Sequence, residues 1–327
     1  MHRFLHVANG TCTADVIQAA GIPGVRSIWA DPLYDGPVPG DLSDDQLLDV
    51  RARFLADGND GDVDPKNDLR RWRSAIADHD SYDELILWYE HDLFDQLNLI
   101  QLVTWLRSNV PASKPVSLVC IGSFPGRPRF KGLGELTPGE LAPLLDTRQP
   151  VTDAQLALAE RAWQAFRDSS PEALDRLRRS DTGALPYLAP AITRFLQEYP
   201  WTNDGLSRCE RRLLALAGDA DVELLTLFPR MHDDERAYYI TDGTLASMAQ
   251  ALSETSPPLL VRTSPADSRH NGLGATVRVT AAGRGVLAGE RDRVKTSGID
   301  RWLGGVHLVG RDQTWRWHDG RQQIVRA

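Results

Sequence analysis

Long apolar runs are absent from this chain of 327 residues. A membrane-spanning helix needs about 18 or more consecutive apolar residues, and no such stretch occurs. The opening residues, MHRFLHVANG, become polar too soon for a secretory signal. We therefore expect a cytoplasmic protein with no membrane partner.

Cysteine is scarce, and the spacing of the cysteines does not indicate a metal site. The three cysteines, Cys12, Cys120 and Cys209, lie far apart and form no CxxC pair. An odd number without close pairs argues against a disulfide framework and against a zinc cluster. This pattern predicts reduced thiols.

Several catalytic and nucleotide-binding motifs are also missing. The sequence has no GxSxG elbow, no HExxH, no GxxxxGK loop and no kinase motif set. Gly10 is followed by TCTA, so the GxGxxG dinucleotide fingerprint is incomplete, and the GxG at Gly132 and Gly134 has no strand before it. These absences argue against NAD-dependent hydride transfer and leave the cofactor unknown.

Charge is unevenly distributed along the chain. Residues 1–150 carry 14 Lys and Arg against 22 Asp and Glu, so they account for the whole net charge of −8. From Arg278 onward the chain is basic. An acidic first half is a poor non-specific partner for nucleic acid, whereas the basic end leaves nucleic-acid binding open.

Length and apolar content predict more than one domain. Residues 1–134 alternate apolar runs with amphipathic stretches, which indicates a Rossmann-like α/β domain with a mainly parallel sheet. The expected strands are residues 4–8, 25–30, 84–89 and 116–122.

Helices are predicted between these strands. Thr11 or Thr13 is suited to cap the first helix, and Ser43 with Gln46 forms a capping box for the second. A third helix is expected at about 65–79. A fourth follows the strand at 84–89 and carries an apolar stripe at Leu93, Leu97, Ile100, Leu102 and Trp105.

The rest of the chain predicts two further segments. Residues 135–205 read as a helical middle segment, opened by helix starts at Thr137-Pro138, Thr152 and Pro171. Residues 206–327 show three helices and then two strands, the order of a winged-helix-like α+β domain. A C-terminal hairpin is expected to carry Trp315 and Trp317 on alternating positions.

The stretch LWYEHDLFDQLN, residues 87–98, places polar groups where a strand passes into a helix. Ligands of a parallel sheet bind at the carboxyl ends of its strands, so the polar residues that follow each strand mark a candidate site. We expect catalytic groups at Glu90, His91, Asp92 and Asp95, and ligand-binding groups at Asn9, Gly10, Thr11, Thr13, Asp31, Gly36, Gln96, Ser123 and Arg127.

These residue types suit particular roles. Backbone amides from Thr11 to Thr13, at a helix N-terminus, suit an anion such as phosphate. Asp31 is placed to accept a ribose hydroxyl, and Arg127 could reach a phosphate. The three acids and His91 suit general acid–base catalysis or a hard divalent metal, whose presence the sequence leaves open.

A structural interpretation stands beside the catalytic one. Asp92 is a natural N-cap, and Asp95 lies three residues later, where an acid favours the helix dipole. His6, inside the first strand, is expected to be a core residue. Gly36 in Asp35-Gly36-Pro37 reads first as part of a turn.

Four pieces, LHVANGTCTADVI, DPLYDGPVP, LWYEHDLFDQLNLIQLVTWL and FKGLGELTPGELAPLL, occur in this order within residues 3–145. Together they resemble the bacterial family known as domain of unknown function 1835. The family more usually has Gly-Asp-Ser where this chain has Gly10-Thr11-Cys12. The resemblance implies the α/β architecture and points to Asn9, Gly10 and the acids, but it implies no particular reaction.

Two functions follow from these observations. The first is a hydrolase or transferase, or a ligand sensor, for a nucleotide-like or phosphorylated small molecule. The second is a regulatory protein in which residues 206–327 bind DNA or a protein partner while the N-terminal domain senses a ligand. Basic residues are absent from TLASMAQAL, the expected recognition helix, which argues against major-groove reading and leaves protein contact or domain packing open beside DNA.

Overall fold

The computed structural model describes residues 3–57, 64–263, 272–312 and 315–326. The chain forms two compact units, residues 1–192 with 302–306 and residues 193–301 with 307–327. No helix in the described ranges is long and apolar enough to cross a membrane.

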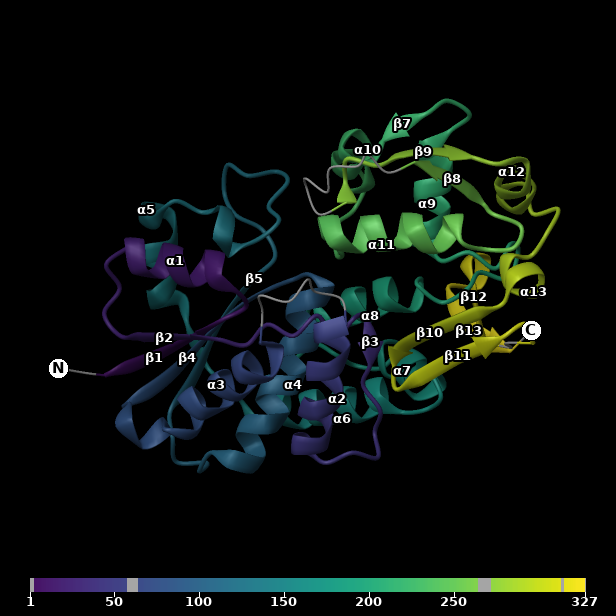
Figure 1. Ribbon diagram of the computed structural model, residues 1–327. Helices are drawn as coiled ribbons and strands as arrows, with labels where there is room; N and C mark the ends of the chain where they lie inside the picture. Colours follow the sequence, from purple (N-terminus) through teal and green to yellow (C-terminus); the bar gives the residue numbers. More distant parts are fainter. Residues whose placement is uncertain (1–2, 58–63, 264–271, 313–314, 327) are drawn as a thin grey trace. The chain divides into compact units, whose positions relative to one another are not determined.

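A five-stranded sheet lies at the centre of the first unit (Figure 1). Its strand order is β2-β1-β4-β5-β6, and all neighbours are parallel except β5 and β6. The predicted mixed α/β fold with a mainly parallel sheet is therefore confirmed. The strands are β1 (Phe4–Ala8), β2 (Val25–Ile28), β4 (Glu84–Glu90), β5 (Val116–Ile121) and β6 (Gln149–Pro150).

The predicted segments 1–134, 135–205 and 206–327 do not coincide with the two units. Strand β6 extends the sheet of the first unit, and α6 (Asp153–Arg167) packs against α4 (Leu93–Asn109). Most of the expected middle segment thus belongs to the first unit. A two-residue strand containing proline offers no periodicity from which to predict it.

The strand order reverses between β1 and β4. The chain leaves β1 for β2 on one side, then crosses back to β4 on the other side of β1. Parallel strands need such crossovers, and the point where they diverge opens a crevice beyond the strand ends. The carboxyl ends of β1 and β4 are therefore the place where this sheet can hold a ligand.

Helices cover both faces of the sheet (Figure 1). On one face, α1 (Thr11–Ala19) and α5 (Pro138–Leu141) pack with Ile86 and Trp88 in one apolar cluster. Helices α4 and α3 (Pro65–Ala77) lie over the other face. Strand β4 is buried from Leu85 to Glu90 because both of its faces are covered.

Helix α4 is buried almost all round, which corrects the predicted one-sided apolar stripe. Polar side chains such as Asn98 and Gln101 are buried along with the leucines. Each has a hydrogen-bond partner: Asn98 Nδ2 donates to Asp31 O at 2.8 Å, and Gln101 Oε1 accepts from the Trp29 indole at 2.8 Å. Packing between the sheet and α6 leaves no solvent-facing side for most of this helix.

His6 is a core residue, as predicted. It is fully buried, its Nδ1 accepts from the Trp88 indole at 3.1 Å, and its Nε2 lies 3.2 Å from Pro23 O. Burial lowers the pKa of His6. The neutral ring with its proton on Nε2 therefore satisfies both partners.

The helix caps agree with the sequence in all but one place. Ser43 and Gln46 exchange hydrogen bonds before α2 (Asp44–Asp57), and Thr152 with Gln155 caps α6 in the same way. The first helix differs. It begins at Thr11, after Gly10, without a side-chain cap, so neither Thr11 nor Thr13 is the N-cap.

The second unit holds a small antiparallel sheet with strand order β7-β9-β8. Along the chain, α9 precedes the first strand, α10 and α11 lie between β7 and β8, and α12 follows β9. The elements are α9 (Arg208–Ala217), β7 (Val222–Glu223), α10 (Leu224–Met231), α11 (Asp242–Ser253), β8 (Leu260–Thr263), β9 (Thr276–Val279) and α12 (Ala281–Leu287).

As predicted, Trp315 and Trp317 lie on alternating positions of a C-terminal antiparallel pair of strands. Strand β12 (Trp315–His318) pairs with β13 (Gln323–Arg326), and not with the earlier strands β10 (Ile299–Gly304) or β11 (Val306–Gly310). Arg316, between the two tryptophans, is also buried. Strand β12 is therefore buried from Trp315 to Trp317. The remaining helices are α7 (Glu172–Leu177), α8 (Leu188–Leu196) and α13 (Arg293–Ser297).

Candidate functional site

Three acids gather where the strand order reverses. Glu90 ends β4, Asp92 precedes α4, and Asp95 lies in its first turn; these three residues form the acid cluster. One carboxylate oxygen from each lies within 4.8 Å of the others. Asn9, directly after β1, donates from Nδ2 to Asp95 Oδ2 at 3.0 Å. That hydrogen bond joins the ends of β1 and β4 across the reversal.

Backbone groups hold the acid cluster in place. The Glu90 amide donates to Asp95 Oδ1 at 2.7 Å, and the Asp95 amide donates to Asp92 Oδ1 at 2.8 Å. Gln96 Nε2 donates to the Glu90 carbonyl at 2.6 Å. The strand end and the first helical turn therefore form one hydrogen-bonded corner, which fixes all three side chains.

The loop at Gly132 and Leu133, which comes 43 residues after Glu90 in the chain, packs against the Glu90 side chain. The amide of Leu133 donates to Glu90 Oε1, and a Cβ at Gly132 would lie only 2.5 Å from Glu90 Oε2. Glycine at 132 is required by this close approach rather than by its extended backbone. The same loop touches α1, because a Cβ at Gly134 would lie 2.9 Å from Cys12 Cβ.

Burial gives the acid cluster unusual protonation behaviour. Glu90 is 4% exposed, and burial together with the Asp92 charge raises its pKa to about 8. Burial and the Glu90 charge raise the pKa of Asp95 well above its usual range. Among the described residues, no Lys, Arg or His forms an ion pair with Glu90 or Asp95. These carboxyls therefore need a proton or a cation.

Asp92 does what the structural interpretation of the sequence predicts. Its side chain caps α4 by accepting from Asp95 N, and Asp95 occupies the expected first-turn position. Capping uses one oxygen and does not require a charge, since asparagine caps equally well. The cap and a ligand-binding role are therefore compatible in Asp92.

The donor set fits a hard divalent cation. Carboxylate and amide oxygens are the ligands that Mg²⁺ and Ca²⁺ take in proteins. Asn9 supplies an amide beside the carboxylates, and its buried Oδ1 has no hydrogen-bond partner in the described part of the chain. A cation would both satisfy this oxygen and compensate the buried acids.

His91 and Gln96 are not among the candidate cation ligands, because their side chains contact other groups. The His91 ring packs against Phe130 and Tyr187, each with ring centroids 6.2 Å away. Gln96 is buried beneath the Glu90 carbonyl, where it also meets the Cys120 thiol at 3.7 Å. Of the residues predicted at the site, the structure joins Asn9, Glu90, Asp92, Asp95 and Gln96 through hydrogen bonds.

The start of α1 lies next to this group in the chain. Gly10 follows Asn9, and its carbonyl accepts from Ala14 N at 3.1 Å. Thr11 is exposed and Thr13 is buried. Because no side chain caps this helix, its first amides are suited to an anion that reaches the end of β1.

Asp31 and Gly36 are engaged elsewhere. Both Asp31 oxygens accept from the buried Arg51 guanidinium, with an Arg51 Nη2–Asp31 Oδ1 distance of 2.7 Å. Gly36 has φ 76° and begins β3 (Gly36–Pro37), which pairs with Leu303 and Gly304 rather than lying in a simple turn. Asp31 is thus an ion-pair residue, and its predicted contact with a ribose gains no support.

Ser123 and Arg127 lie outside the acid cluster. Ser123 is exposed, and Arg127 Nη2 lies 2.8 Å from Glu140 Oε2. The Arg127 side chain and the Thr137 backbone and hydroxyl donate to Glu140 and lower its pKa to about 2. Arg127 is therefore committed to a local ion pair.

Sequence reasoning missed the contribution of two segments. The loop at Gly132 and Leu133 was dismissed because no strand precedes it, yet it binds the Glu90 carboxylate. Cys120 donates to the Glu90 carbonyl at 3.6 Å. The repeated glycines of FKGLGE were the available signal, since close backbone approach is one reason for glycine in a loop.

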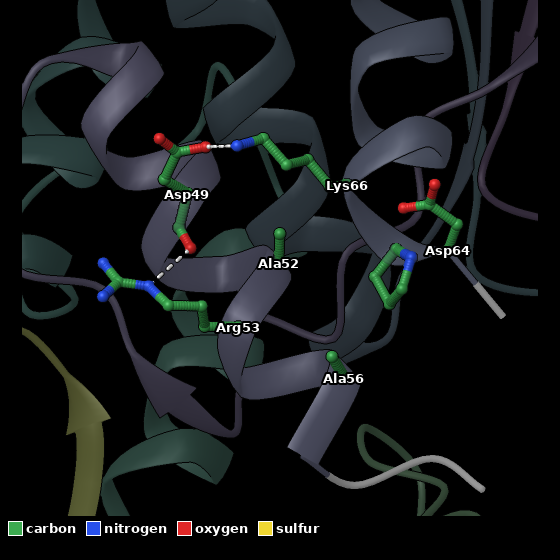
Figure 2. Close-up of a pocket in the computed structure, with 7 residues that line it drawn as sticks. Asp49, Ala52, Arg53, Ala56, Asp64 and Lys66 are labelled. Atoms are coloured by element: carbon green, nitrogen blue, oxygen red, sulfur yellow. Dashed lines mark hydrogen bonds and ion pairs between the residues drawn. The ribbon is translucent and has the colours of Figure 1, made fainter. Parts of the chain in front are cut away.

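A surface hollow lies away from these acids. It measures about 610 Å³ and lies between α2 and α3 (Figure 2). Asp49 pairs there with Lys66 at 2.7 Å, and both side chains are exposed. No buried polar side chain among the described residues marks the hollow as a site, so we assign it no function.

The second unit has arginines near its small sheet, and two of them are paired. Arg278 Nε lies 3.0 Å from Asp221 Oδ1, and Arg284 Nη1 lies 2.6 Å from Asp219 Oδ1. Helix α11 contains no Lys or Arg. This arrangement provides little of the positive surface that phosphate contacts require.

No family model matches the chain, and no curated protein matches it either. Membership of the family of domain of unknown function 1835 therefore stays a prediction from the four sequence pieces.

Proposed function

We propose that this chain is a cytosolic enzyme of the hydrolase or transferase type that acts on a nucleotide-like or phosphorylated small molecule. The reacting group would lie at the carboxyl ends of β1 and β4, in a Rossmann-like domain. Glu90, Asp92 and Asp95, with the Asn9 amide oxygen, would hold a divalent cation there.

One observation carries the proposal: two buried carboxyls, Glu90 and Asp95, lack a basic partner among the described residues, at the point where the strand order reverses. Buried charges are normally paired or bind metals. The unpartnered Asn9 Oδ1 beside them independently indicates a missing ligand. The uncapped start of α1 adds a place for an anion.

The proposed chemistry is phosphoryl transfer to water or to another acceptor hydroxyl. The acceptor oxygen forms a bond to phosphorus while the P–O bond to the leaving group breaks. A carboxylate of the acid cluster takes the acceptor proton, and the leaving oxygen takes a proton from solvent. A cation in this position would neutralise the phosphate charge.

Asp92→Asn provides a direct test, because it keeps the cap but removes the charge. Wild type is titrated with Mg²⁺ and Mn²⁺ by calorimetry, and phosphate release is measured from nucleotides and sugar phosphates. We expect at least a tenfold loss of cation affinity in Asp92→Asn with little change in melting temperature.

Asp64→Asn is the matched control. Asp64 also caps a helix, α3, by accepting from Asn67 N at 3.0 Å, but it lies outside the acid cluster. Its substitution should leave cation binding unchanged. Equal cation affinity in wild type and Asp92→Asn, or no binding by wild type, would rule out the metal site.

A second function rests on the order of elements in the second unit. We infer a winged-helix-like fold from the order α9, β7, α10, α11, β8, β9 and the sheet order β7-β9-β8. The paired Arg278 and Arg284 favour a protein partner over DNA. Salt-dependent retardation of duplex DNA by the full chain, reduced in Arg262→Ala, would instead favour DNA.

A further inference from the structure

A cavity of about 190 Å³ lies at one edge of the sheet in the first unit. Strand β6 pairs only with Ser117 and Leu118 of β5, so β5 from Val119 to Ile121 borders the cavity. The polar side chains around it are Gln96, Cys120, Thr147, Gln149, Gln155 and Tyr187.

The side-chain oxygen of Gln96 is buried and accepts no hydrogen bond in the described part of the chain. The residue is 1% exposed, and its Nε2 is used by the Glu90 carbonyl. Its Oε1 has no hydrogen-bond partner within the described ranges, although the residue lines the cavity. A buried amide oxygen in this state is unfavourable, and a ligand N–H or O–H would relieve it.

The cavity suits an uncharged group. None of the described residues that line it is charged. The Cys120 thiol donates to the Glu90 carbonyl at 3.6 Å. An anion here would lose its hydration without gaining a countercharge, and the nearby acid cluster would repel it.

Tyr187 forms an aromatic wall of the cavity and contacts His91, the residue after β4. It lines the cavity, and its ring meets the His91 ring edge-on. A Cβ at Gly122 would lie 2.5 Å from this ring, so Tyr187 packs directly on the end of β5. An aromatic wall with a few hydrogen-bonding groups is typical of sites for flat or ring-shaped ligands.

We propose that this cavity binds the neutral ring of the substrate, a nucleobase or a sugar, through a donor on that ring to Gln96 Oε1. The inference rests on the proposed function in one respect: the phosphate of the same molecule would lie at the acid cluster. Gln96 would contact the ring through Oε1, and its Nε2 already donates to the carbonyl of Glu90 in that cluster. The cavity would thereby select the substrate, while the acids act on its phosphate.

The test uses the full chain and neutral compounds without phosphate: adenosine, guanosine, cytidine, uridine, ribose and glucose. Binding is followed by saturation-transfer NMR and by melting temperature. We expect one class, nucleosides or sugars, to bind wild type. Ala184→Phe should abolish binding, because Ala184 lines the cavity and a phenyl group would fill it.

Gln96→Met tests the acceptor, since methionine keeps the volume but removes the amide. We expect affinity to fall at least tenfold, whereas Gln18→Met, on α1 and outside the cavity, should bind as wild type does. The inference is overturned if none of the six compounds binds wild type, or if Ala184→Phe binds equally well.

These measurements distinguish failure of the cation-site proposal from failure of the cavity proposal. Mg²⁺ affinity should be unchanged in Ala184→Phe and reduced in Asp92→Asn. Retained cation binding without any neutral ligand would remove the cavity proposal alone. Neutral-ligand binding without a cation response would remove the metal site and leave the cavity as a binding site.

Discussion

Glu90 in the first unit and Glu198 in the second are both buried glutamates, but their surroundings differ. Arg194 Nη1 lies 2.6 Å from Glu198 Oε1, whereas Glu90 has no basic partner in the described part of the chain. Burial would raise both pKa values. The charges of Arg194 and Arg301 outweigh burial for Glu198 and lower its pKa to about 2, while that of Glu90 rises to about 8.

This difference separates structural acids from candidate functional ones. Asp31 with Arg51, and Glu198 with Arg194, each have a guanidinium as countercharge within the chain. In the described part of the chain, Glu90 and Asp95 have neighbouring acids, backbone donors and the Asn9 amide, but no basic partner. A buried acid is therefore informative about function when its countercharge is missing, rather than when it is merely buried.

The largest expected effect comes from making Glu198 resemble Glu90. Arg194→Met leaves Glu198 and Glu235 buried without the guanidinium that contacts both, at 2.6 and 2.7 Å. We expect the second unit to lose about 3–5 kcal/mol of unfolding free energy at pH 7. Hydrogen exchange measured at increasing urea concentrations would give this loss of unfolding free energy. Arg212→Met, which breaks a half-exposed pair on α9, is the control and should cost far less.

The reverse change removes the charge at Glu90. Glu90→Gln keeps an oxygen for the Leu133 amide but cannot ionise. Without a cation at pH 8, we expect the first unit to gain about 1–2 kcal/mol, whereas Glu198→Gln should destabilise the second unit. Denaturant unfolding with EDTA measures both. A destabilised Glu90→Gln protein would show that the ionised carboxylate is already compensated.

The two units should respond to pH in opposite directions. The raised pKa of Glu90 stabilises the first unit fully below pH 4.5, and this contribution is lost as pH rises towards 8. The lowered pKa of Glu198 stabilises the second unit above pH 4.5, and this contribution is lost as pH falls towards 2. Hydrogen exchange in β4 and α9, corrected for intrinsic rates, would follow each unit. Mg²⁺ should suppress only the alkaline loss.

The smallest effect concerns an exposed pair. Arg127→Gln breaks the contact with Glu140, which is partly open to solvent. We expect a change in melting temperature of less than about 1 °C, and no change in phosphate release. If phosphate release instead falls tenfold, Arg127 leaves Glu140 to bind substrate, as the sequence predicted.

The sequence predicted the strands of the central sheet well because their apolar runs are bounded by clear turn and cap residues. It also predicted that Glu90, Asp92 and Asp95 would meet at a strand end, since carboxyl ends of parallel strands share an edge. It could not predict β6 or the partner of β12, because two or four residues carry too little periodicity to identify a strand's neighbour.

Local sequence by itself determined the N-cap role of Asp92 and the core position of His6, since both depend on immediate neighbours. Only the tertiary structure decided which acids are compensated. Asp31 pairs with Arg51, 20 residues away in the chain. Glu90 accepts from the Leu133 amide, 43 residues away, and has no Lys or Arg partner among the described residues. Electrostatic free energy depends on distance and burial in space, and spacing along a chain specifies neither.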